Sequence, residues 1–315
     1  MIANKKILIT GGAGFVGSHI AEQLYEKNEI ILFDNFLSGF RENVTHLLKN
    51  KNVKLVEGDI RDKIAVKKVM EGADIVFHEA AQINPAKAVS DPYFDFNINV
   101  DGGFNVLDAA RQADVKKFLF ASTNVYFNPK YVPIDEKHPI QLVSPYAAAK
   151  FAVEAYCMCF FEAYGLNTVR LRYTNIYGEG QRSEKSESGV IPIFIKKILS
   201  NENPIIFGDG KQTRDFVNIS DIVNANLLAA ESKKTGGEVY NIGYGKEISV
   251  LDLAKLLIKL SGKKLEPVFG PVRTADFKRC VPDTSKAFNA FGYKPKVELE
   301  DGLKKTVEWW KNNPE

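Results

Sequence analysis

Two residue types that can move a proton stand four positions apart in the segment SPYAAAK at 144–150. Tyr146 and Lys150 would share one face of a helix, because residues four apart are neighbours on a helix surface. A phenol has an ordinary pKa near 10 and is a poor base at neutral pH. An ammonium group within about 4–6 Å, together with a positively charged ring, would favour the phenolate. The pair therefore predicts general acid–base chemistry, although the same spacing also occurs on ordinary amphipathic helices.

A second set of residues is suited to hold a pyrophosphate. Residues 10–17 read TGGAGFVG, directly after the strand-like KKILI and before the helix-like SHIAEQLYEK. The glycines let the chain turn tightly and bring backbone N–H groups against phosphate oxygens, which the start of the helix also attracts. Asp34 ends the next strand-like run, where a carboxylate accepts hydrogen bonds from the ribose hydroxyls of a dinucleotide.

Asp34 also bears on which dinucleotide is bound. A carboxylate at this position would repel the 2′-phosphate of NADP, so NAD is favoured, with Arg41 as the nearby counterargument. Farther along, Asp59 in the run EGDIRD is a candidate for contact with the adenine. It is equally a candidate for the N-cap of a helix at 64–71, and the two roles are compatible.

The elements that must position these residues alternate between strand-like and helix-like runs. The strand-like runs are continuously apolar, as is typical of parallel strands covered on both faces. They are Lys6–Thr10, Glu29–Asp34, Val53–Gly58, Asp74–His78, Lys117–Ser122 and Thr168–Arg172. The helix-like runs between them are Gly17–Lys27, Ile64–Glu71, Phe94–Gln112 and Tyr146–Tyr164. This alternation predicts an α/β fold with a Rossmann-type, doubly wound parallel sheet.

Beyond residue 175 the alternation gives way to short mixed elements and an amphipathic helix near Val250–Ser261. Two runs, Asp221–Glu231 and Val239–Ile242, are typical of a helix and a strand that return to the first domain. We therefore expect two domains with the following bounds: an NAD-binding domain at 1–175 with returning segments near 215–245, and a smaller α/β domain that binds the substrate, mainly at 176–315.

The motifs taken together resemble those of the extended short-chain dehydrogenase/reductase family, in its branch that modifies nucleotide sugars. The resemblance spans nearly the whole chain and rests on TGGAGFVG at 10–17, FDN at 33–35, GDIRD at 58–62, HEAA at 78–81, NVDGG at 99–103, STNVY at 122–126, SPYAAAK at 144–150, LRYTNIYG at 171–178, GDGKQTRDFV at 208–217 and PDTSKA at 282–287. It implies a catalytic set of three residues. Ser122 would hydrogen-bond the reacting hydroxyl of the sugar, Tyr146 would be the acid–base, and Lys150 would hold the nicotinamide ribose and lower the pKa of the tyrosine.

The resemblance also implies which residues contact each ligand. The residues for NAD are Gly11, Gly14, Phe15, Val16, Gly17, Asp34, Asn35, Ser38, Gly39, Asp59, Ile60, Ala80, Ala81, Asn99, Tyr146, Lys150 and Tyr173, of which Asn99 and Tyr173 would fix the nicotinamide half. Those for a UDP-sugar are Ser122, Thr123, Tyr146, Asn175, Val190, Arg214, Arg273, Asp276 and Cys280. Guanidinium groups suit phosphate because they bind two oxygens at once. Alternatively, Arg214 and Arg273 pair with the carboxylates of Asp215 and Asp276.

Cys280 bears on the choice of sugar. In related 4-epimerases the corresponding position borders the C2 substituent, where tyrosine excludes N-acetylated sugars and a small residue admits them. We therefore expect activity on UDP-GlcNAc/UDP-GalNAc as well as UDP-Glc/UDP-Gal. The alternative is that Cys280 is simply a small buried residue. Phe127 departs from the family pattern, which has glycine there, and would reshape the loop over the sugar.

Thr123 and Asn124 narrow the reaction within the family. The related 4,6-dehydratases carry an Asp–Glu pair at these positions, and the related decarboxylases carry a Glu at the second. An amide cannot serve as a general acid, so 4-epimerisation is the reaction that remains. In it, hydride passes from C4 to NAD, the 4-keto sugar turns, and hydride returns to the other face. The alternatives are a nucleotide-sugar reductase or dehydrogenase, a UDP-uronic acid 4-epimerase, and a catalytically silent NAD-binding sensor, against which the intact catalytic set argues.

Composition sets the remaining expectations. The net charge of +3 is spread over scattered lysines, which argues against a nucleic-acid binder. Three cysteines lack metal-site spacing and cannot form a disulfide framework, and no apolar run is long enough to span a membrane. The start MIANKKILITGG lacks the features of a signal peptide. We expect a cytoplasmic enzyme without a metal, which forms a homodimer, as the family does, through helices near 99–112 and 146–164.

Overall fold

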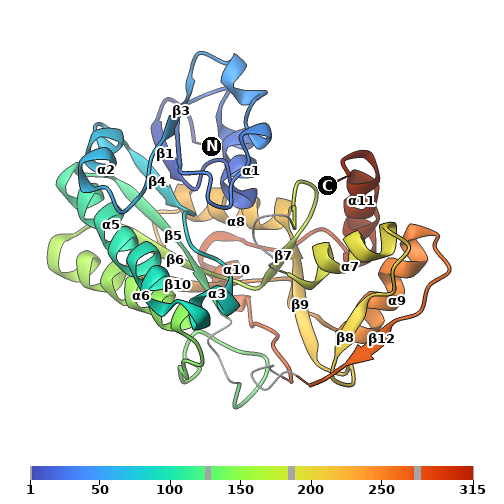
Figure 1. The fold of residues 1–315 in the computed structure, drawn as a ribbon. Helices are drawn as coiled ribbons and strands as arrows, with labels where there is room; N and C mark the ends of the chain where they lie inside the picture. The colour runs from blue at the N-terminus through green and yellow to red at the C-terminus, as the bar shows by residue number, and fades with distance from the viewer. Residues whose placement is uncertain (1, 125–128, 184–188, 273–277, 315) are drawn as a thin grey trace.

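A parallel sheet forms the centre of the larger lobe in the computed structural model, which describes residues 2–124, 129–183, 189–272 and 278–314 (Figure 1). The seven strands run in the order β10-β6-β5-β4-β1-β2-β3, with every neighbouring pair parallel. They are β1 (Lys6–Thr10), β2 (Glu29–Asp34), β3 (Val53–Glu57), β4 (Ile75–His78), β5 (Lys117–Thr123), β6 (Thr168–Tyr173) and β10 (Glu238–Ile242). The predicted strands agree with β1 to β6 to within one residue at each end.

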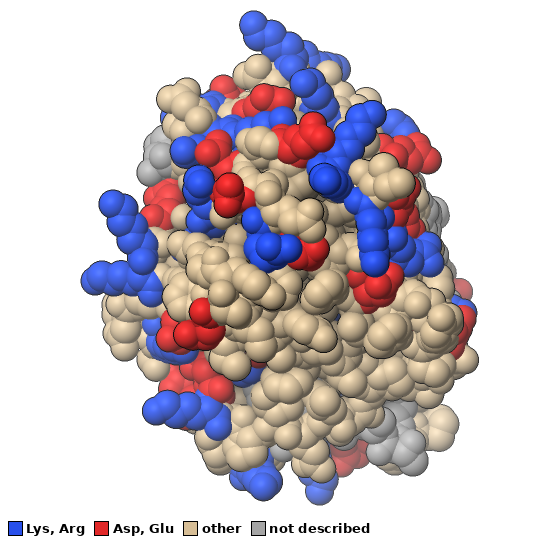
Figure 2. Space-filling view, turned by 90° about the vertical axis from the view of Figure 1, so that its left-hand side faces the viewer, with Lys and Arg blue, Asp and Glu red and all other residues tan. Residues whose placement is uncertain are grey.

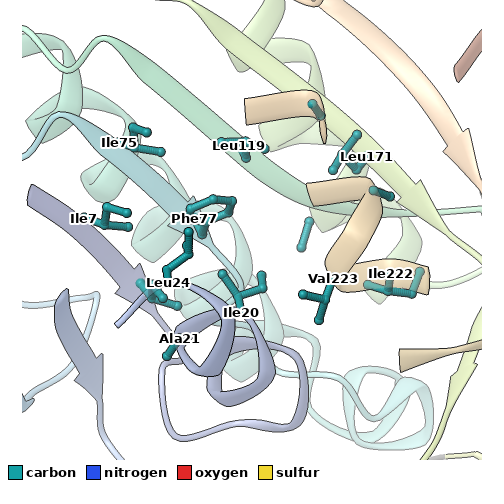
Figure 3. Close-up of a cluster of buried hydrophobic side chains, with 14 of the residues drawn as sticks. Ile7, Ile20, Ala21, Leu24, Ile75, Phe77, Leu119, Leu171, Ile222 and Val223 are labelled. Atoms are coloured by element: carbon teal, nitrogen blue, oxygen red, sulfur yellow. The ribbon is translucent and has the colours of Figure 1, made fainter. Parts of the chain in front are cut away.

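Two apolar cores cover the two faces of this sheet. Ile7 and Ile9 of β1 belong to one core and Leu8 to the other, because successive side chains on a strand point to opposite faces. Figure 3 shows the first core, where side chains from β1, β4, β5 and β6 meet those of two helices. Burying each such Leu, Ile or Phe side chain contributes about 1.5–3 kcal/mol.

The helices divide between the two cores. On the first face lie α1 (Phe15–Leu24), α8 (Ile219–Glu231) and α10 (Ser285–Phe291). On the second face lie α2 (Lys63–Met70), α5 (Gly103–Gln112) and α6 (Pro145–Tyr164). Two short 3-10 turns, Arg41–Asn43 and Leu47–Lys49, connect β2 to β3.

The helix predicted at Phe94–Gln112 is confirmed as one helical run, which begins two residues earlier at Pro92. After α3 (Pro85–Ser90), α4 (Pro92–Phe96) continues without a break through a wider π-helical segment at Asn97–Gly102 into α5. The side chains of Asn84 and Asp91 cap α3 and α4, and a proline opens each helix. The π-helical segment brings Gly102 against Ile60, where a Cβ atom would lie 2.7 Å from the isoleucine side chain. The sequence prediction of a regular helix did not include this segment, in which hydrogen bonds run from residue i to residue i+5.

The smaller lobe has its own core. A three-stranded sheet joins β7 (Asn175–Tyr177), β9 (Thr213–Asn218) and β11 (Glu247–Ser249), and a two-stranded sheet joins β8 (Ile205–Phe207) and β12 (Val268–Gly270). Three helices pack on these strands: α7 (Val190–Leu199), α9 (Val250–Ser261) and α11 (Leu299–Asn312). The helix predicted at Val250–Ser261 coincides with α9.

The chain crosses between the two lobes more than once. After β9, α8 packs against α1 in the larger lobe, and β10 then adds to the sheet beside β6. The sequence pattern had led us to expect that these two segments return to the first domain. Within the described residues, no helix is long and apolar enough to cross a membrane.

Candidate active site

A cavity of about 880 Å³ lies where the strands of the large sheet end. In open parallel sheets, ligands bind outside the carboxyl ends of the strands, where the strand order reverses, and here that point lies between β1 and β4. From the set expected to bind NAD, the cavity is lined by Gly11, Gly14, Phe15, Val16, Gly17, Asp34, Asn35, Ser38, Ile60, Ala80, Ala81, Tyr146, Lys150 and Tyr173. From the set expected to bind the substrate, Ser122, Thr123, Asn175 and Val190 also line it.

Other predicted site residues lie elsewhere. Gly39, Asp59, Asn99, Arg214 and Cys280 are not among the residues that line the cavity within the described part of the chain. Arg273, Asp276 and Phe127 lie outside the described residues.

The glycine loop leaves no room for side chains. Gly11 has a φ of +66°, and a Cβ atom there would lie 2.7 Å from the backbone nitrogen of Ala80. A Cβ atom on Gly17 would overlap the carbonyl oxygen of Gly11. The loop leads into α1, whose first N–H groups have no partner within the helix and attract anions. The loop and the helix start therefore fit the pyrophosphate of a dinucleotide.

The carboxylate of Asp34 is buried beside this loop. Its oxygens accept hydrogen bonds from the backbone N–H groups of Ala13 at 2.9 Å and Phe36 at 2.7 Å. Arg41 points elsewhere, because its guanidinium group pairs with Glu57 at 3.1 Å and lies over the ring of Phe36. A buried carboxylate at the end of β2, with the nearby arginine turned away, favours NAD over NADP.

One of the two roles predicted for Asp59 is contradicted by the structure, and the contact with adenine stays a prediction. Its carboxylate accepts hydrogen bonds from Arg61, at 2.7 and 2.9 Å, and from Asn35 at 2.8 Å. The Arg61 hydrogen bonds lower the pKa of Asp59 to about 2. The N-cap of α2 is Asp62, whose side chain accepts from two backbone N–H groups, so the N-cap prediction for Asp59 is wrong.

The helix start at Ser144 places the acid–base pair at the cavity wall. Ser144 caps α6 by accepting a hydrogen bond from the N–H of Ala147 at 3.2 Å. Lys150 is buried, and its ammonium group lies 4.5 Å from the centre of the Phe120 ring. Burial lowers the pKa of Lys150 to about 8.

The effect of the lysine on the pKa of Tyr146 stays a prediction, and other groups dominate that pKa in the protein alone. Burial and the nearby charge of Asp95 raise the pKa of Tyr146 well above its ordinary value, and a hydrogen bond with the Thr123 side chain only partly offsets this. Burial is the largest of these effects, because a charged phenolate is costly in an apolar wall. A further positive charge in the cavity is needed to favour the phenolate.

Two acidic residues in this region were missed by the sequence analysis. The carboxylate of Glu154 accepts a 2.6 Å hydrogen bond from the hydroxyl of Ser122. Glu79 lines the cavity, accepts a 3.2 Å hydrogen bond from the hydroxyl of Tyr173, and has a pKa that burial raises to about 7. The available signals were the HEAA motif for Glu79 and the position of Glu154 four residues after Lys150.

Asn99 hydrogen-bonds the loop after β4 and is not among the residues that line the cavity. Its side-chain amide accepts a hydrogen bond from the N–H of Gln82 and donates one to the carbonyl oxygen of the same residue, both at 2.9 Å. It also donates to the carboxylate of Asp95 at 2.9 Å. Any contribution of Asn99 to holding the nicotinamide half therefore acts through the loop that contains Ala80 and Ala81.

Comparison with known proteins identifies the family. The sequence profile described as "NAD dependent epimerase/dehydratase family" matches residues 7–243. The chain belongs to this family. A putative UDP-glucose 4-epimerase of Methanocaldococcus jannaschii is 43% identical over 98% of this chain and 99% of the relative. A human dTDP-D-glucose 4,6-dehydratase is 36% identical over 98% of this chain and 91% of the relative.

Solved structures of the family have the same fold. UDP-glucose 4-epimerase of Thermotoga maritima, solved with UDP-glucose, is 38% identical, with a TM-score of 0.92 over 98% of this chain and 100% of that chain. The Thermus thermophilus UDP-glucose 4-epimerase, solved with NAD, is 35% identical, with a TM-score of 0.88 over 98% of this chain and 99% of that chain. Membership of this NAD-dependent family and the fit of the glycine loop make NAD the cofactor of the enzyme.

The two residues after Ser122 are those on which the sequence analysis based its choice of reaction. Thr123 lines the cavity and carries a hydroxyl, while the next side chain, Asn124, is buried. The amide nitrogen and oxygen of Asn124 have no hydrogen-bond partner in the described part of the chain. Neither side chain can act as a general acid, unlike a carboxyl group.

At the far end of the cavity, Asn175 donates a 2.9 Å hydrogen bond to the carbonyl oxygen of Asp215. Arg214 donates to the carbonyl oxygen of Thr213 at 2.8 Å. Cys280 is 4% exposed and packs with Ile134 and Ala147, which agrees with the small buried residue given as the alternative. No group of three or more potential metal ligands occurs among the described residues.

Proposed function

We propose that this enzyme inverts the configuration at C4 of a UDP-hexose. The observation that carries this proposal is the content of the cavity wall at the end of β5. There a serine, a tyrosine and a lysine meet, while the two residues after the serine are a threonine and an asparagine. This set can move a proton at one sugar hydroxyl, and none of its five side chains is a carboxylic acid of the kind that elimination or decarboxylation needs.

Each of these side chains would have its own role in the reaction. Tyr146 would take the proton of the C4 hydroxyl and return it, and Thr123, which hydrogen-bonds the phenol, would stabilise the phenolate. Lys150, held against the ring of Phe120, would bind a ribose hydroxyl and contribute its charge. NAD, held by the glycine loop and Asp34, supplies the acceptor and donor of hydride. Because the hydride returns, the reaction consumes no external reductant.

The names of the relatives support a UDP-sugar as substrate, since UDP-glucose 4-epimerases are among those with the same fold over the whole chain. We propose UDP-Glc/UDP-Gal as the main pair, with Asn175 and Val190 facing the substrate. Cys280 lies in a small core, so a bulkier residue there would disturb packing as well as any sugar contact. Acceptance of UDP-GlcNAc/UDP-GalNAc therefore has to be tested with the wild-type enzyme.

The decisive experiment is incubation of the purified enzyme with UDP-Gal, UDP-GalNAc or UDP-GalA without added dinucleotide. Formation of the C4 epimer, followed by NMR, supports the proposal and identifies the accepted sugars. A stoichiometric rise in absorbance at 340 nm together with a lasting keto sugar would instead indicate a net oxidoreductase, and would overturn the proposal.

We further propose a homodimer formed through α5 and α6. On α6, the side chains of Tyr156, Met158 and Tyr164 are 43%, 47% and 60% exposed, and α5 lies beside it. Figure 2 faces this side of the molecule and shows a broad area with few Lys, Arg, Asp or Glu side chains across its lower half. A surface with few charged groups and with exposed Tyr and Met side chains is typical of a contact between protein surfaces.

A further inference from the structure

A third residue shares the helix face of the acid–base pair. Tyr146, Lys150 and Glu154 follow one another at intervals of four on α6, so their side chains lie along one stripe of the helix. The carboxylate of Glu154 is deeply buried, and its side chain is only 2% exposed. Its Oε2 lies 2.6 Å from the hydroxyl oxygen of Ser122, which lines the cavity.

Arg172 fixes the charge of Glu154. Its Nη2 lies 2.5 Å from Oε1 of Glu154, and its Nε lies 3.0 Å from Oε2. The arginine side chain is 3% exposed, and Arg172 stands directly opposite Ser122 in the pairing of β5 with β6. A guanidinium group does not lose its proton in proteins, so the forked pair keeps Glu154 ionised.

Other charged and polar groups surround this pair without replacing it. Arg170 donates to the backbone carbonyl oxygen of Glu154, and Arg172 donates to that of Glu136, both at 3.5 Å. The charges of Lys150 and Glu154 attract each other across the helix face. The carboxylate of Glu154 is thus held among positive groups that favour its charged form.

An ionised carboxylate can only accept hydrogen bonds. Ser122 has one hydroxyl proton, so this proton points to Glu154 and the remaining lone pairs of the oxygen face away from it. We infer that Glu154 is a positioning residue that fixes Ser122 as a hydrogen-bond acceptor toward the cavity. This inference rests on the proposed function, because it concerns the sugar hydroxyl that Ser122 meets there.

The orientation has a consequence for the two states of the sugar. The hydroxyl group at C4 has one proton, which can point to Ser122 before the reaction and must turn to Tyr146 for transfer, whereas a carbonyl oxygen at C4 has no proton to donate. Ser122 therefore binds the alcohol and releases the ketone. Release allows the 4-keto sugar to turn its other face toward the dinucleotide, which inversion requires.

The test removes the acceptor of the serine proton without leaving a buried charge unpaired. The variant Glu154→Met/Arg172→Met replaces both partners with apolar side chains of similar length, a change that buried ion pairs commonly tolerate. Ser122 can then turn its proton into the cavity and hold the carbonyl oxygen. We expect kcat to fall by about tenfold to a hundredfold, with reduced dinucleotide accumulating at 340 nm during turnover.

Ser122→Ala and the triple variant complete the comparison. Without the serine hydroxyl there is nothing for Glu154 to orient, so the triple variant should match Ser122→Ala in kcat, and neither should accumulate reduced dinucleotide. If the Met pair lowers kcat by the same factor with and without Ser122, or if no reduced dinucleotide accumulates, the inference is wrong. Circular dichroism and the amount of retained dinucleotide report whether each variant is folded.

Glu154→Gln keeps the inference testable even if the Met pair does not fold. Its amide oxygen can still accept from Ser122, so kcat should stay within about threefold of wild type, although the weaker bond to Arg172 lowers stability. A loss as large as that of Ser122→Ala would overturn the inference. All rates are measured as hydride transfer, whichever product forms, so a net oxidation would contradict the proposed function while still testing the role of Glu154.

Discussion

At the scale of single residues, the protein environment of Tyr146 opposes the charge that catalysis needs. Burial and Asp95 raise the pKa of its phenol, and burial lowers the pKa of Lys150 to about 8. Only the hydrogen bond from Thr123 acts in the other direction within the described site. The positive ring of an oxidised dinucleotide is therefore expected to switch the tyrosine into its basic form, which links proton transfer to the redox state of the cofactor.

Replacing Tyr146 with phenylalanine removes the proposed proton acceptor while keeping the ring. We expect kcat to fall by about a hundredfold or more, the usual contribution of a general acid–base group, with the dinucleotide still bound. Epimer formation followed by NMR measures the loss. The matched control is Tyr93→Phe on α4, which removes the hydroxyl of a side chain that is 73% exposed. Unchanged turnover in the Tyr146 variant would contradict the proposed role.

The raised pKa of Glu79 predicts how the stability of the folded protein changes with pH. Its pKa is raised by burial from 4.5 to about 7, so the folded protein binds a proton at this site that the unfolded chain releases between these values. Stability from this group is therefore present below about pH 4.5 and is lost as the pH rises through about 7. Glu79→Gln should raise the unfolding temperature of dinucleotide-free protein at pH 8 and change it little at pH 4.5.

Differential scanning fluorimetry at the two pH values measures this difference. Glu308→Gln on α11 makes the same chemical change at an exposed position and serves as the control. An equal effect of Glu79→Gln at both pH values would show that the carboxyl group of Glu79 does not titrate in this window.

At the scale of elements, the turn between β1 and α1 depends on glycine for a steric reason. In Gly17→Ala the new methyl group would overlap the carbonyl oxygen of Gly11, so the turn must open or the helix must shift. We expect a loss of about 1–3 kcal/mol in the free energy of unfolding and a weaker affinity for NAD, measured by urea unfolding and by dinucleotide titration.

Gly262→Ala is the control for this prediction. Gly262 ends α9 with a φ of +76°, and a Cβ atom there meets nothing within 4 Å. Alanine should therefore cost about 1–2 kcal/mol through backbone strain alone, with no change in NAD affinity. If Gly17→Ala also leaves the affinity for NAD unchanged, the loop does not approach the pyrophosphate.

Strands β1 to β6 could be predicted from the sequence because each is a continuous apolar run between turn residues. The helix at Phe94–Gln112 was predicted as well, but the π-helical form of its Asn97–Gly102 segment was not, because it depends on how that helix packs. The spacing of the motifs likewise predicted that the glycines, Tyr146 and Lys150 belong to one site. In the structure all of them line the same cavity. It gave no information on which aspartate of EGDIRD would cap α2, because that depends on where the chain turns in space.

Glu154, Cys280 and Arg214 show the same difference between what motif spacing predicts and what the folded structure decides. Spacing places Glu154 on the helix face of Tyr146, but its contact with Ser122 depends on β5 lying beneath α6, which is a property of the folded sheet. Cys280 and Arg214 were expected at the substrate, yet the cavity of the described residues is formed without them. Local motifs therefore predict which site residues lie at the ends of strands. The positions of the other site residues depend on tertiary packing.

At the scale of the whole molecule, the apolar side of α6 predicts the association state. Introducing charge with Met158→Lys/Tyr164→Lys should convert a dimer into a monomer, because two ammonium groups would have to lose water at the contact. Light scattering at micromolar concentration measures the mass. The control is Phe288→Lys on α10, an exposed aromatic side chain on the opposite face of the sheet. A wild-type protein of monomeric mass would contradict the proposed dimer.

The position of β10 also constrains how the chain is made. This edge strand pairs with β6, yet it is translated only after most of the second lobe's strands. Until then the nascent chain exposes the unpaired backbone of β6, which invites aggregation. The ribosome must therefore make the chain as far as Ile242, including β7, β8 and β9, before the large sheet is complete, which ties its maturation to the synthesis of the other lobe.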